Sequence, residues 1–548
     1  MLKWIIAESP ASENLVASLL RQRGVSDSER FLRPRLKDLA DPFALPAMAQ
    51  AVDRILLALD RRERIVLWGD YDVDGVSSLA MLSRLLRAYG AAPHAFLPAR
   101  MDEGYGLSPE AVVRCCDTLR PELLIALDCG TSSAAEIDDL NARGVDVIVV
   151  DHHECPARLP NALALVNPKL GADFHYLCTA GLVFKLSHAL LKRRPLENFD
   201  LREYLDLVTL GTVADMAPLI LENRILVRKG LAQLGRTRWP GVQALLETAS
   251  VTMPARPSDV GFRLGPRLNA AGRLGTAEAA FELLTTDDAA RARGLAADLD
   301  ARNRERQGLE REIASLAEKQ LESRYDSGRD FAIVVGETGW HPGVLGIVAS
   351  RLAKTHHRPA LVIGFDEAGA GRGSGRGIAG LSLVDALGRC GHLLEKFGGH
   401  EMAAGFSVSR GNFEEFRAAF LACARSLLTE DLLLPRLRLD VETSLAAVDF
   451  EFLLQHEQLQ PFGIGNPQPV FLARNVAPDG EPRILKEKHL LFNLRQAGRK
   501  QSAIYFDGAL SPLPRPPWDV AFQIERNEYQ GLVGVQVQIL AIREAEPR

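Results

Sequence analysis

The chain has 548 residues, a mass of 60.0 kDa and a formal net charge of −5. A chain of this length is too long for one growing hydrophobic core, so a single-domain protein is excluded and about three to four domains are expected. The composition, 47% hydrophobic and 25% charged, is typical of a folded globular protein. The slight negative charge argues against a protein that coats nucleic acid through bulk positive charge, so any nucleic-acid contact must be local.

The seven cysteines are scattered, with no C-x-x-C pair and no spacing typical of a structural zinc site. This pattern fits a reducing compartment. The N-terminal sequence MLKWIIAESP lacks the features of a signal peptide, and no apolar stretch reaches the ~18 residues that a membrane span needs. We therefore expect a soluble, cytoplasmic protein that makes no membrane contact, and we expect a monomer.

Short apolar runs alternate with helix-period segments between residues 50 and 166. The runs at 64–72, 93–99, 122–130 and 145–153 predict strands, and the segments between them at 76–90, 108–119 and 132–144 predict helices. A β-α-β-α series of this kind predicts a parallel sheet with helices on both faces.

The remaining chain divides into three further parts. Helices are predicted at 179–194 and 200–211, and the long charged segment 296–325 is predicted to be a connector helix. A second α/β block spans 330–428, opens with a strand at 331–337 and holds two glycine-rich turns. From about residue 434 the chain ends in short alternating runs, which predict a small antiparallel barrel or sheet.

Acidic groups and histidines follow the strands of the first block. The carboxyl ends of neighbouring parallel strands share one edge of the sheet, where ligands bind, so these side chains should converge. They are Asp70, Asp72, Asp74, Asp128, Asp151, His152 and His153.

Several carboxylates cannot lie together without a cation, because each like-charged neighbour makes ionisation more costly. Ligands drawn from Asp and His without Cys favour magnesium or manganese. The number of donors allows two ions about 3.5–4 Å apart, an arrangement used in phosphoryl transfer. A lone Asp after a strand is more often a turn former or helix N-cap, but the combination of clusters favours a metal site.

Four of these segments resemble the motifs of the DHH phosphoesterase superfamily: GDYDVDG (69–75), ALDCG (126–130), DHH (151–153) and GTVADMAPL (211–219). Later segments narrow the resemblance, over roughly residues 50–510, to the RecJ family of exonucleases. These segments are ARMDEGYGL (99–107), GPRLNAAGR (265–273), WHPGVLGIVASR (340–351), GSGR (373–376), FGGHEMAAG (397–405) and PFGIGNPQPVF (461–471).

The resemblance implies an α/β fold in which a parallel-sheet DHH domain is joined by a long helix to a smaller α/β DHHA1 domain, with a C-terminal β-barrel of the OB-fold type. We divide the chain accordingly. The parts are an N-terminal segment (1–48), the DHH catalytic domain (49–240), a helical connector (241–328), the DHHA1 domain (329–430) and the OB-fold-like domain (435–548).

The resemblance also implies an activity: metal-dependent 5′→3′ hydrolysis of single-stranded DNA to mononucleotides in recombinational, mismatch and excision repair. The implied cofactors are two divalent ions, Mn²⁺ or Mg²⁺, and the implied partners are a single-strand-binding protein and a helicase. Two alternatives stay open. One is a DHH/DHHA1 phosphodiesterase for short oligoribonucleotides or cyclic dinucleotides, and the other is a non-catalytic scaffold that binds single strands.

Site residues follow from the resemblance where this sequence matches the motifs. The implied metal ligands are Asp70, Asp72, Asp74, Asp128, His152 and Asp215. The catalytic set is Asp72, Asp74, Asp128, His152, His153, Asp215 and His400. A 5′-phosphate pocket is implied at Arg100, Ser374 and Arg376. The expected DNA contacts are Tyr105, Arg267, Asn269, Arg273, His341 and Lys488.

Trp68 marks a departure from related pyrophosphatases, which carry a histidine four residues before the middle Asp of the first motif. Tryptophan cannot ligate a metal, so either one ion has fewer protein ligands or Asp70 compensates. Trp340 is a second position with two interpretations, a base-stacking surface or a residue that fills the core.

Overall fold

The computed structural model describes residues 2–7, 14–98, 106–529 and 531–545. The chain divides into two compact units, which we describe separately. Unit 1 contains residues 42–215 and 233–435, and unit 2 contains residues 2–41, 216–232 and 436–548.

A five-stranded parallel sheet, in the order β3-β2-β4-β5-β6, opens unit 1. Its strands are β2 (Ile65–Gly69), β3 (His94–Phe96), β4 (Leu123–Leu127), β5 (Asp146–Val150) and β6 (Ala164–Val166). The central strands β2 and β4 are buried at every position and contain no polar side chain, because helices cover both faces of the sheet. The predicted parallel sheet is thereby confirmed. The prediction lacked β6, whose three residues are too few to show a pattern.

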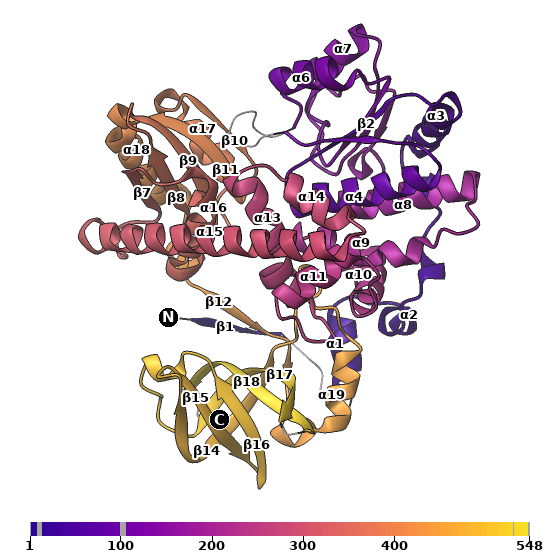
Figure 1. Ribbon diagram of the computed structural model, residues 1–548. Coiled ribbons are helices and arrows are strands. Elements are labelled where there is room, and N and C mark those ends of the chain that lie inside the picture. The colour runs from indigo at the N-terminus through magenta and orange to yellow at the C-terminus, as the bar shows by residue number, and fades with distance from the viewer. Residues whose placement is uncertain (1, 8–13, 99–105, 530, 546–548) are drawn as a thin grey trace. The chain divides into compact units, whose positions relative to one another are not determined.

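Four helices form the layers on this sheet (Figure 1). Helices α6 (Pro109–Leu119) and α7 (Ala134–Ala142) pack on one face through a core that includes Trp68 and Val149. Helices α4 (Val73–Ala88) and α8 (Thr179–Arg193) lie against the other. Helix α3 (Met48–Arg61) packs beside β6 and α8, and α9 (Leu205–Ala214) packs on α4 and α8.

The helical part of unit 1 runs from residue 240 to 324. It consists of α11 (Pro240–Thr248), α12 (Pro257–Asp259), the π-helix η5 (Val260–Leu264), α13 (Gly265–Leu274), α14 (Glu278–Thr285) and α15 (Ala289–Arg324). Helix α15 is about 54 Å long at 1.5 Å per residue. It packs against α11, α13 and α14 near its start and against α16 and β7 near its end, so the predicted connector helix is confirmed.

A second, mixed sheet follows, in the order β10-β11-β9-β8-β7. Its strands are β7 (Ile333–Thr338), β8 (Ala360–Phe365), β9 (Ala370–Arg376), β10 (Lys396–Gly399) and β11 (Ala403–Ser409), and only β7 and β8 are parallel. Helices α15 and α16 (Pro342–His356) share a core with one face. Helices α17 (Leu383–Arg389) and α18 (Phe413–Leu427) share a core with the other.

The glycine-rich segment GRGSGRG (371–377) forms most of strand β9, with only Gly377 beyond the end of the strand. Its glycines alternate and leave space for large neighbours. A Cβ on Gly373 would lie 2.2 Å from the Phe406 ring, and one on Gly375 would lie 2.6 Å from a Leu361 methyl group. Glycine is unfavourable in a strand, but here the lack of a side chain lets aromatic and leucine side chains pack on the strand backbone.

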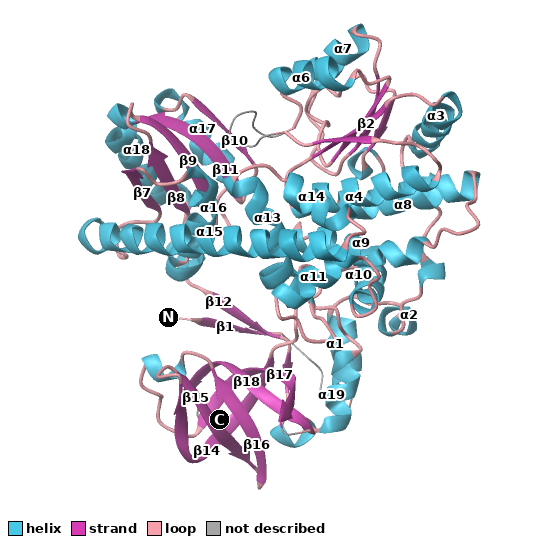
Figure 2. Ribbon diagram, viewed as in Figure 1, coloured by secondary structure: helices cyan, strands magenta, loops and turns pink. Residues whose placement is uncertain are grey.

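Unit 2 contains a closed barrel whose strands follow the order β14-β15-β16-β18-β17, with β17 pairing back to β14 (Figure 2). The strands are β14 (Phe471–Leu485), β15 (His489–Gln496), β16 (Arg499–Tyr505), β17 (Trp518–Tyr529) and β18 (Leu532–Glu544). This five-stranded closed topology is that of an OB-fold. The prediction of a purely antiparallel barrel is wrong in one place, because β16 and β18 pair in parallel.

Further elements of unit 2 come from both ends of the chain. Strand β1 (Lys3–Ile6) pairs in parallel with β12 (Arg436–Leu439), and β13 (Val441–Glu442) pairs with β14. The helices are α1 (Leu15–Gln22), α2 (Ser28–Leu32), α19 (Phe450–Glu457) and most of α10 (Leu221–Leu234).

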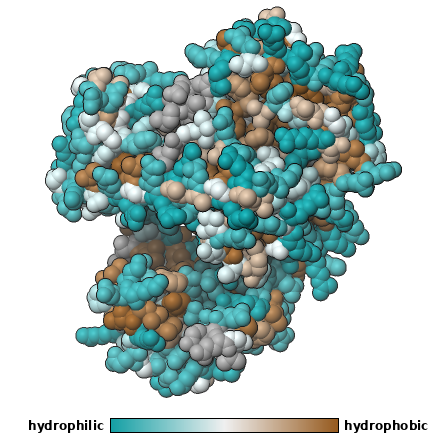
Figure 3. All heavy atoms as spheres, in the orientation of Figure 1, coloured by the Kyte–Doolittle hydropathy of each residue, from teal (hydrophilic) through white to brown (hydrophobic). Residues whose placement is uncertain are grey.

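On the face drawn in Figure 3, hydrophilic residues predominate and hydrophobic ones form smaller groups among them. No single helix of the described residues is long and apolar enough to cross a bilayer. The pair 36–44 and 48–61, bent by 82°, meets the criteria of length and composition only as a pair.

Candidate active site

The acidic motifs follow strands that lie side by side at the reversal of strand order. Strand β2 pairs with β3 on one side and β4 on the other, so the chain leaves β2 and β4 in opposite directions at this point. A crevice outside the carboxyl ends of strands at such a switch point is where open α/β sheets bind ligands. Asp70 and Asp72 follow β2, Asp128 follows β4, and His152 follows β5.

Asp72 and Asp74 are held at the start of α4. Asp72 is the N-cap, and its Oδ1 accepts hydrogen bonds from the backbone N–H groups of Asp74 (2.9 Å) and Gly75 (3.1 Å). The turn requires glycine at 75, because a Cβ there would lie 2.6 Å from the Asp70 carbonyl oxygen. Asp74 is buried and accepts hydrogen bonds from the N–H groups of Thr179 and Ala180, both 2.8 Å, at the start of α8.

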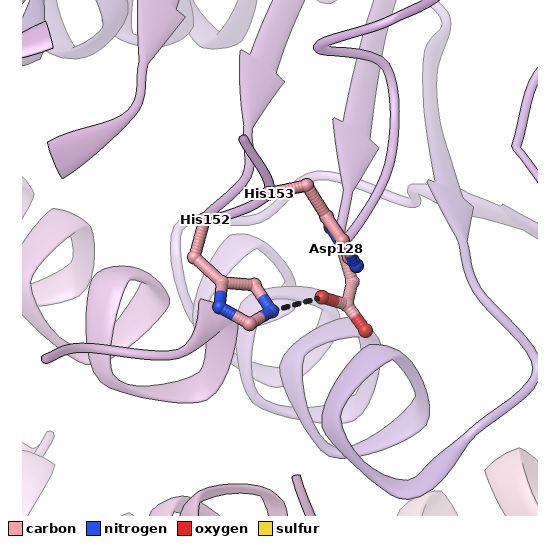
Figure 4. Close-up of side chains that lie close together, drawn as sticks. All are labelled: Asp128, His152 and His153. Atoms are coloured by element: carbon pink, nitrogen blue, oxygen red, sulfur yellow. Dashed lines mark ion pairs between the residues drawn. The ribbon is translucent and has the colours of Figure 1, made fainter. Parts of the chain in front are cut away.

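Asp128 faces the same space from β4. Its φ of 65° lies in the left-handed region, a strained conformation for a residue other than glycine, and the residue is 2% exposed. The Thr179 hydroxyl donates a hydrogen bond of 2.9 Å to Asp128 Oδ1. The His152 ring and the Asp128 carboxylate point toward each other, with 3.4 Å between His152 Nε2 and Asp128 Oδ1 (Figure 4).

Asp215 completes the arrangement as the C-cap of α9. His152 Nε2 lies 3.9 Å from Asp215 Oδ2 and 3.9 Å from Asp74 Oδ2, so one imidazole nitrogen is close to three carboxylates. The buried Cys178 also offers its sulfur within 4.8 Å of ligand atoms of Asp74 and Asp215. Burial and the charges of these two carboxylates raise the pKa of the Cys178 thiol well above its usual value.

His153 is oriented by Asp151. Asp151 Oδ1 lies 2.7 Å from His153 Nδ1 and accepts the backbone N–H of His152 at 2.8 Å. Burial opposes protonation of His153, but the hydrogen bond and charge of Asp151 raise its pKa to about 9. Burial likewise opposes ionisation of Asp151, yet His153 holds the pKa of this carboxyl below its usual range.

The cluster concentrates negative charge in a buried place. Burial, and then the charges of neighbouring aspartates, raise the pKa values of Asp74, Asp128 and Asp215. Burial lowers the pKa of His152 to about 4, which keeps its imidazole neutral and able to ligate a metal. Such a set of carboxylates favours bound cations, because a cation neutralises the repulsion.

The ligand atoms fall into three groups, each with all atoms within 4.8 Å of one another. The groups are Asp70, Asp72 and Asp128; Asp128, His152 and His153; and Asp74, Cys178 and Asp215. Two of the groups share Asp128, which could therefore contribute a ligand atom to either. Oxygen and imidazole donors fit Mg²⁺ or Mn²⁺.

Ser374 and Arg376 lie on β9, beside α16. A Cβ on Gly346 would lie 2.9 Å from Ser374 Oγ and 3.4 Å from an Arg376 guanidinium nitrogen. Both side chains therefore pack against α16 at this glycine. Arg273 approaches the same helix and donates from its guanidinium to the Gly343 carbonyl at 3.2 Å. The structure therefore brings three predicted DNA-binding residues to the first two turns of α16.

Other predicted DNA contacts have structural partners. Asn269 Oδ1 accepts the N–H of Val73 at 3.1 Å and so ties α13 to the start of α4. Arg267 pairs with Asp300 at 2.9 Å. His341 is the N-cap of α16, where its Nδ1 accepts the Gly343 N–H at 3.1 Å.

His400 is exposed and follows β10. The hydrogen bond from Lys169 lowers the pKa of Glu154, and the charge of His400 adds to this effect.

The remaining predicted residues lie elsewhere or outside the described chain. Lys488, in unit 2, pairs with Asp507 at 3.3 Å. Trp340 is 5% exposed and belongs to the core under α16, so it fills the core and offers no stacking surface. Trp68 packs on Phe96 inside the core between the sheet and helices α6 and α7. Arg100 and Tyr105 fall outside the described residues.

The sequence analysis assigned no role to the residues that support the cluster. Thr179 bonds Asp74 and Asp128, Thr131 donates its N–H to Asp151, and Asn167 donates to Thr131 Oγ1 and to the His153 carbonyl. Asp151, within the DHH motif, was predicted to converge with the other strand-end groups but was given no role. Thr131, Thr179 and Asn167 lie outside the motifs, and only folding brings them to the site.

Comparisons with known proteins agree with this architecture. The models of the DHH family N-terminal domain, the DHHA1 domain and the RecJ OB domain match residues 64–212, 329–426 and 439–541. The single-stranded-DNA-specific exonuclease RecJ of Dickeya dadantii (strain 3937) is 37% identical over 576 residues, covering 97% of both chains. The chain belongs to the RecJ family.

Two further RecJ proteins define the extent of the match. RecJ of Bacillus subtilis (strain 168) is 36% identical, and the match covers 90% of this chain but 63% of that relative, less than two thirds of its length. The crystal structure of RecJ in complex with Mn²⁺ from Thermus thermophilus matches with a TM-score of 0.84 at 34% identity. That match covers 100% of this chain and 80% of the other.

Proposed function

We propose that this RecJ-family protein is a metal-dependent exonuclease that hydrolyses single-stranded DNA from the 5′ end to mononucleotides. The observation that carries the proposal is the buried set of carboxylates around His152 Nε2, which lies 3.4–3.9 Å from Asp74, Asp128 and Asp215. The names of the relatives, single-stranded-DNA-specific exonucleases, support the substrate.

The residues of the cluster fit two divalent ions, Mn²⁺ or Mg²⁺. Bound ions would activate a water for attack on the terminal phosphodiester and neutralise charge on the leaving oxygen. We assign the ligands to Asp70, Asp72, Asp74, Asp128, His152 and Asp215. The group of Asp70 with Asp72 and Asp128 supports a compensating role for Asp70, since Trp68 is in the core.

The other residues of the site act on the strand. We assign His153, held by Asp151, and the exposed His400 to the catalytic set, in which each would donate an N–H to the phosphate. Ser374 and Arg376, with Arg100, would bind the 5′-phosphate and so set the polarity. Tyr105, Arg267, Asn269, Arg273, His341 and Lys488 stay assigned to the DNA strand as predictions.

The proposal also includes the domain division, the location and the partners of the protein. The domain division predicted from the sequence (1–48, 49–240, 241–328, 329–430 and 435–548) is retained, with the three matched family models as its support. We propose that the protein acts in the cytoplasm, as a monomer, in recombinational, mismatch and excision repair. A single-strand-binding protein and a helicase are the proposed partners.

The test is digestion of single-stranded DNA labelled at the 5′ end, with Mn²⁺, with Mg²⁺ and with EDTA. Wild type should release labelled mononucleotides only with metal, and Asp72→Ala should abolish release. Asp117→Ala, a change at an exposed carboxylate on α6, is the matched control and should leave release unchanged.

Other outcomes would favour the alternatives. Hydrolysis confined to dinucleotides would support a phosphodiesterase for short oligoribonucleotides or cyclic dinucleotides. Tight strand binding with no product in Mn²⁺ would support a non-catalytic scaffold.

A further inference from the structure

The first six residues of the motif PFGIGNPQPVF, residues 461–466, supply none of the proposed site residues and form a loop of unit 2, which we call the glycine loop. Asn466 is 1% exposed, and its side-chain amide donates to the carbonyls of Leu459 (2.9 Å) and Pro461 (2.7 Å). The backbones of Gly463 and Asn466 exchange hydrogen bonds of 2.9 and 3.1 Å. The glycine loop is therefore held in one shape by its own hydrogen bonds.

A second segment of unit 2, residues 216–220, follows the proposed metal ligand Asp215 directly, and we call it the strap. The chain leaves unit 1 at Asp215 and enters unit 2 at Met216. Before this point the chain is held by α9, where the Asp215 N–H donates to the Gly211 carbonyl at 2.9 Å. Met216 has a φ of 59°, in the left-handed region that is strained for a residue other than glycine. Such a turn persists only where the surrounding chain is held in place.

The glycine loop holds the strap. The Leu219 N–H donates to the Ile464 carbonyl at 2.7 Å. A Cβ on Gly463 would lie 2.7 Å from a Leu219 methyl carbon, and a Cβ on Gly465 would lie 3.0 Å from an Ile220 methyl carbon. The two glycines of the motif therefore let the loop approach the strap more closely than any larger residue would.

The Asp215 carboxylate depends on its backbone for its position. Asp74 accepts two backbone N–H groups and Asp128 accepts a hydroxyl, but within the described ranges no group donates a hydrogen bond to the Asp215 side chain. His152 Nε2 is 3.9 Å from Asp215 Oδ2. The direction of this carboxylate is therefore set by the turn at Met216 and by the contacts that hold the strap beyond it.

We infer that the glycine loop is a positioning element for Asp215. By holding the strap, it keeps the Asp215 carboxylate where it can ligate a divalent ion. The inference rests on the proposed function, in which Asp215 is a ligand. Groups that orient a metal ligand change the affinity for the metal by about 10- to 100-fold although they touch no ion. A loop with a role in folding alone would change the stability and leave this affinity as it is.

The experiment measures Mn²⁺ binding to the metal-free protein from the electron paramagnetic resonance signal of free Mn²⁺. Gly463→Val places a branched side chain in the space of Leu219 and should raise the Kd for one Mn²⁺ about 10-fold. Gly463→Ala, which adds the Cβ alone, should show a smaller increase. Gly534→Val, on β18, is the matched control, because no atom lies within 4 Å of a Cβ there, and it should bind Mn²⁺ as wild type does.

Two double variants identify the route of the effect. Leu219→Ala should bring the Kd of the Gly463→Val protein back toward that of wild type, because the shortened side chain makes room for the valine. Asp215→Asn should itself weaken the binding of one Mn²⁺, and Gly463→Val should cause no further loss in that protein, since it acts through the missing carboxylate. Thermal midpoints in EDTA report on stability separately.

The outcomes separate this inference from the proposed function. Wild-type Mn²⁺ affinity in Gly463→Val, or in Gly463→Ala if the valine variant does not fold, would overturn the positioning role alone. An equal further loss in the Asp215→Asn protein would do the same. Wild-type Mn²⁺ binding by Asp215→Asn would overturn the ligand assignment of Asp215 and this inference with it. A wild type that binds Mn²⁺ but releases no mononucleotides would overturn the proposed nuclease activity alone.

Discussion

The two sheets of unit 1 present functional groups in opposite ways. The parallel sheet of β2–β6 places its carboxylates beyond the strand ends, where Asp74 and Asp128 are buried and held by backbone and hydroxyl donors. The mixed sheet of β7–β11 places Ser374 and Arg376 on the face of a strand, where both are partly exposed. Burying a carboxylate without a counter-ion costs free energy, whereas a half-exposed arginine stays hydrated and costs little. The first arrangement therefore suits a resident cation, and the second suits an anionic group that arrives and leaves.

The largest effect is expected at the carboxylate shared by two of the ligand groups. Asp128→Asn should lower hydrolysis of single-stranded DNA by about 1,000-fold or more, because it removes a charge on which metal binding depends. Without added metal its thermal midpoint should equal or exceed that of wild type, since a buried charge is removed. Activity assays and thermal unfolding in EDTA check both parts. A clear loss of stability in EDTA would contradict the view that this cluster is strained without cations.

The placement of Ser374 and Arg376 on the face of β9 can be tested with substrates that differ only at the 5′ end. Wild type should prefer a 5′-phosphorylated strand over a 5′-hydroxyl strand. Ser374→Ala and Arg376→Gln should each reduce this preference by about 10-fold, the effect of one lost charge-assisted hydrogen bond. The measurement is the ratio of kcat/KM for the two strands. Arg372→Gln, at an exposed arginine on the same strand, is the control, and an equal loss there would point to general charge attraction.

The alternating glycines of β9 let large side chains pack directly on the strand backbone, so replacing one of them should lower the stability of the protein. Gly373→Ala should lower the free energy of unfolding by about 3 kcal/mol, because the new Cβ would lie 2.2 Å from the Phe406 ring. Gly405→Ala, on the neighbouring strand, is the matched control, since its Cβ would meet only one atom, at 4.0 Å. The measurement is the free energy of unfolding of both variants in urea. Equal stabilities would mean that the ring moves aside without cost.

The smallest effect concerns a buried carboxylate that is not part of the metal cluster. Asp206 on α9 accepts hydrogen bonds from Thr237 Oγ1 (2.6 Å) and the Leu207 N–H (2.7 Å). Burial raises its pKa to about 6. A carboxyl whose pKa is raised by folding stabilises the fold below its unfolded pKa, and this stability is lost as pH rises toward 6.

As the pH rises from 4 to 7, the unfolding free energy of Asp206→Asn should therefore increase by about 2 kcal/mol relative to that of wild type. Its activity should stay within about 3-fold of wild type, in contrast to Asp128→Asn. Unfolding curves for both proteins at several pH values provide the measurement. A difference that does not change with pH would show that Asp206 keeps an ordinary pKa in the fold.

Much of the metal site was predictable from local patterns. Apolar runs followed at once by Asp70, Asp128 and Asp151 indicated both the parallel strands and the edge at which their ends meet. The same patterns gave no warning that GRGSGRG is a strand, because glycine disfavours strands and its alternation matters only beside Phe406 and Leu361. The pairing of β1 with β12 joins residues more than 400 positions apart, so no local pattern could indicate it.

The sequence by itself determined which groups would meet, since a parallel strand must deliver the residues after it to a common edge. It also determined that these groups are carboxylates and imidazoles. Only the tertiary structure decided their electrostatic state and their support. The burial of Asp128, the orientation of His153 by Asp151 and the hydrogen bonds from Thr179 all depend on which helix covers which atom. Which helix covers which atom is decided by packing between residues far apart in the chain, and such packing produces no periodic pattern in the sequence.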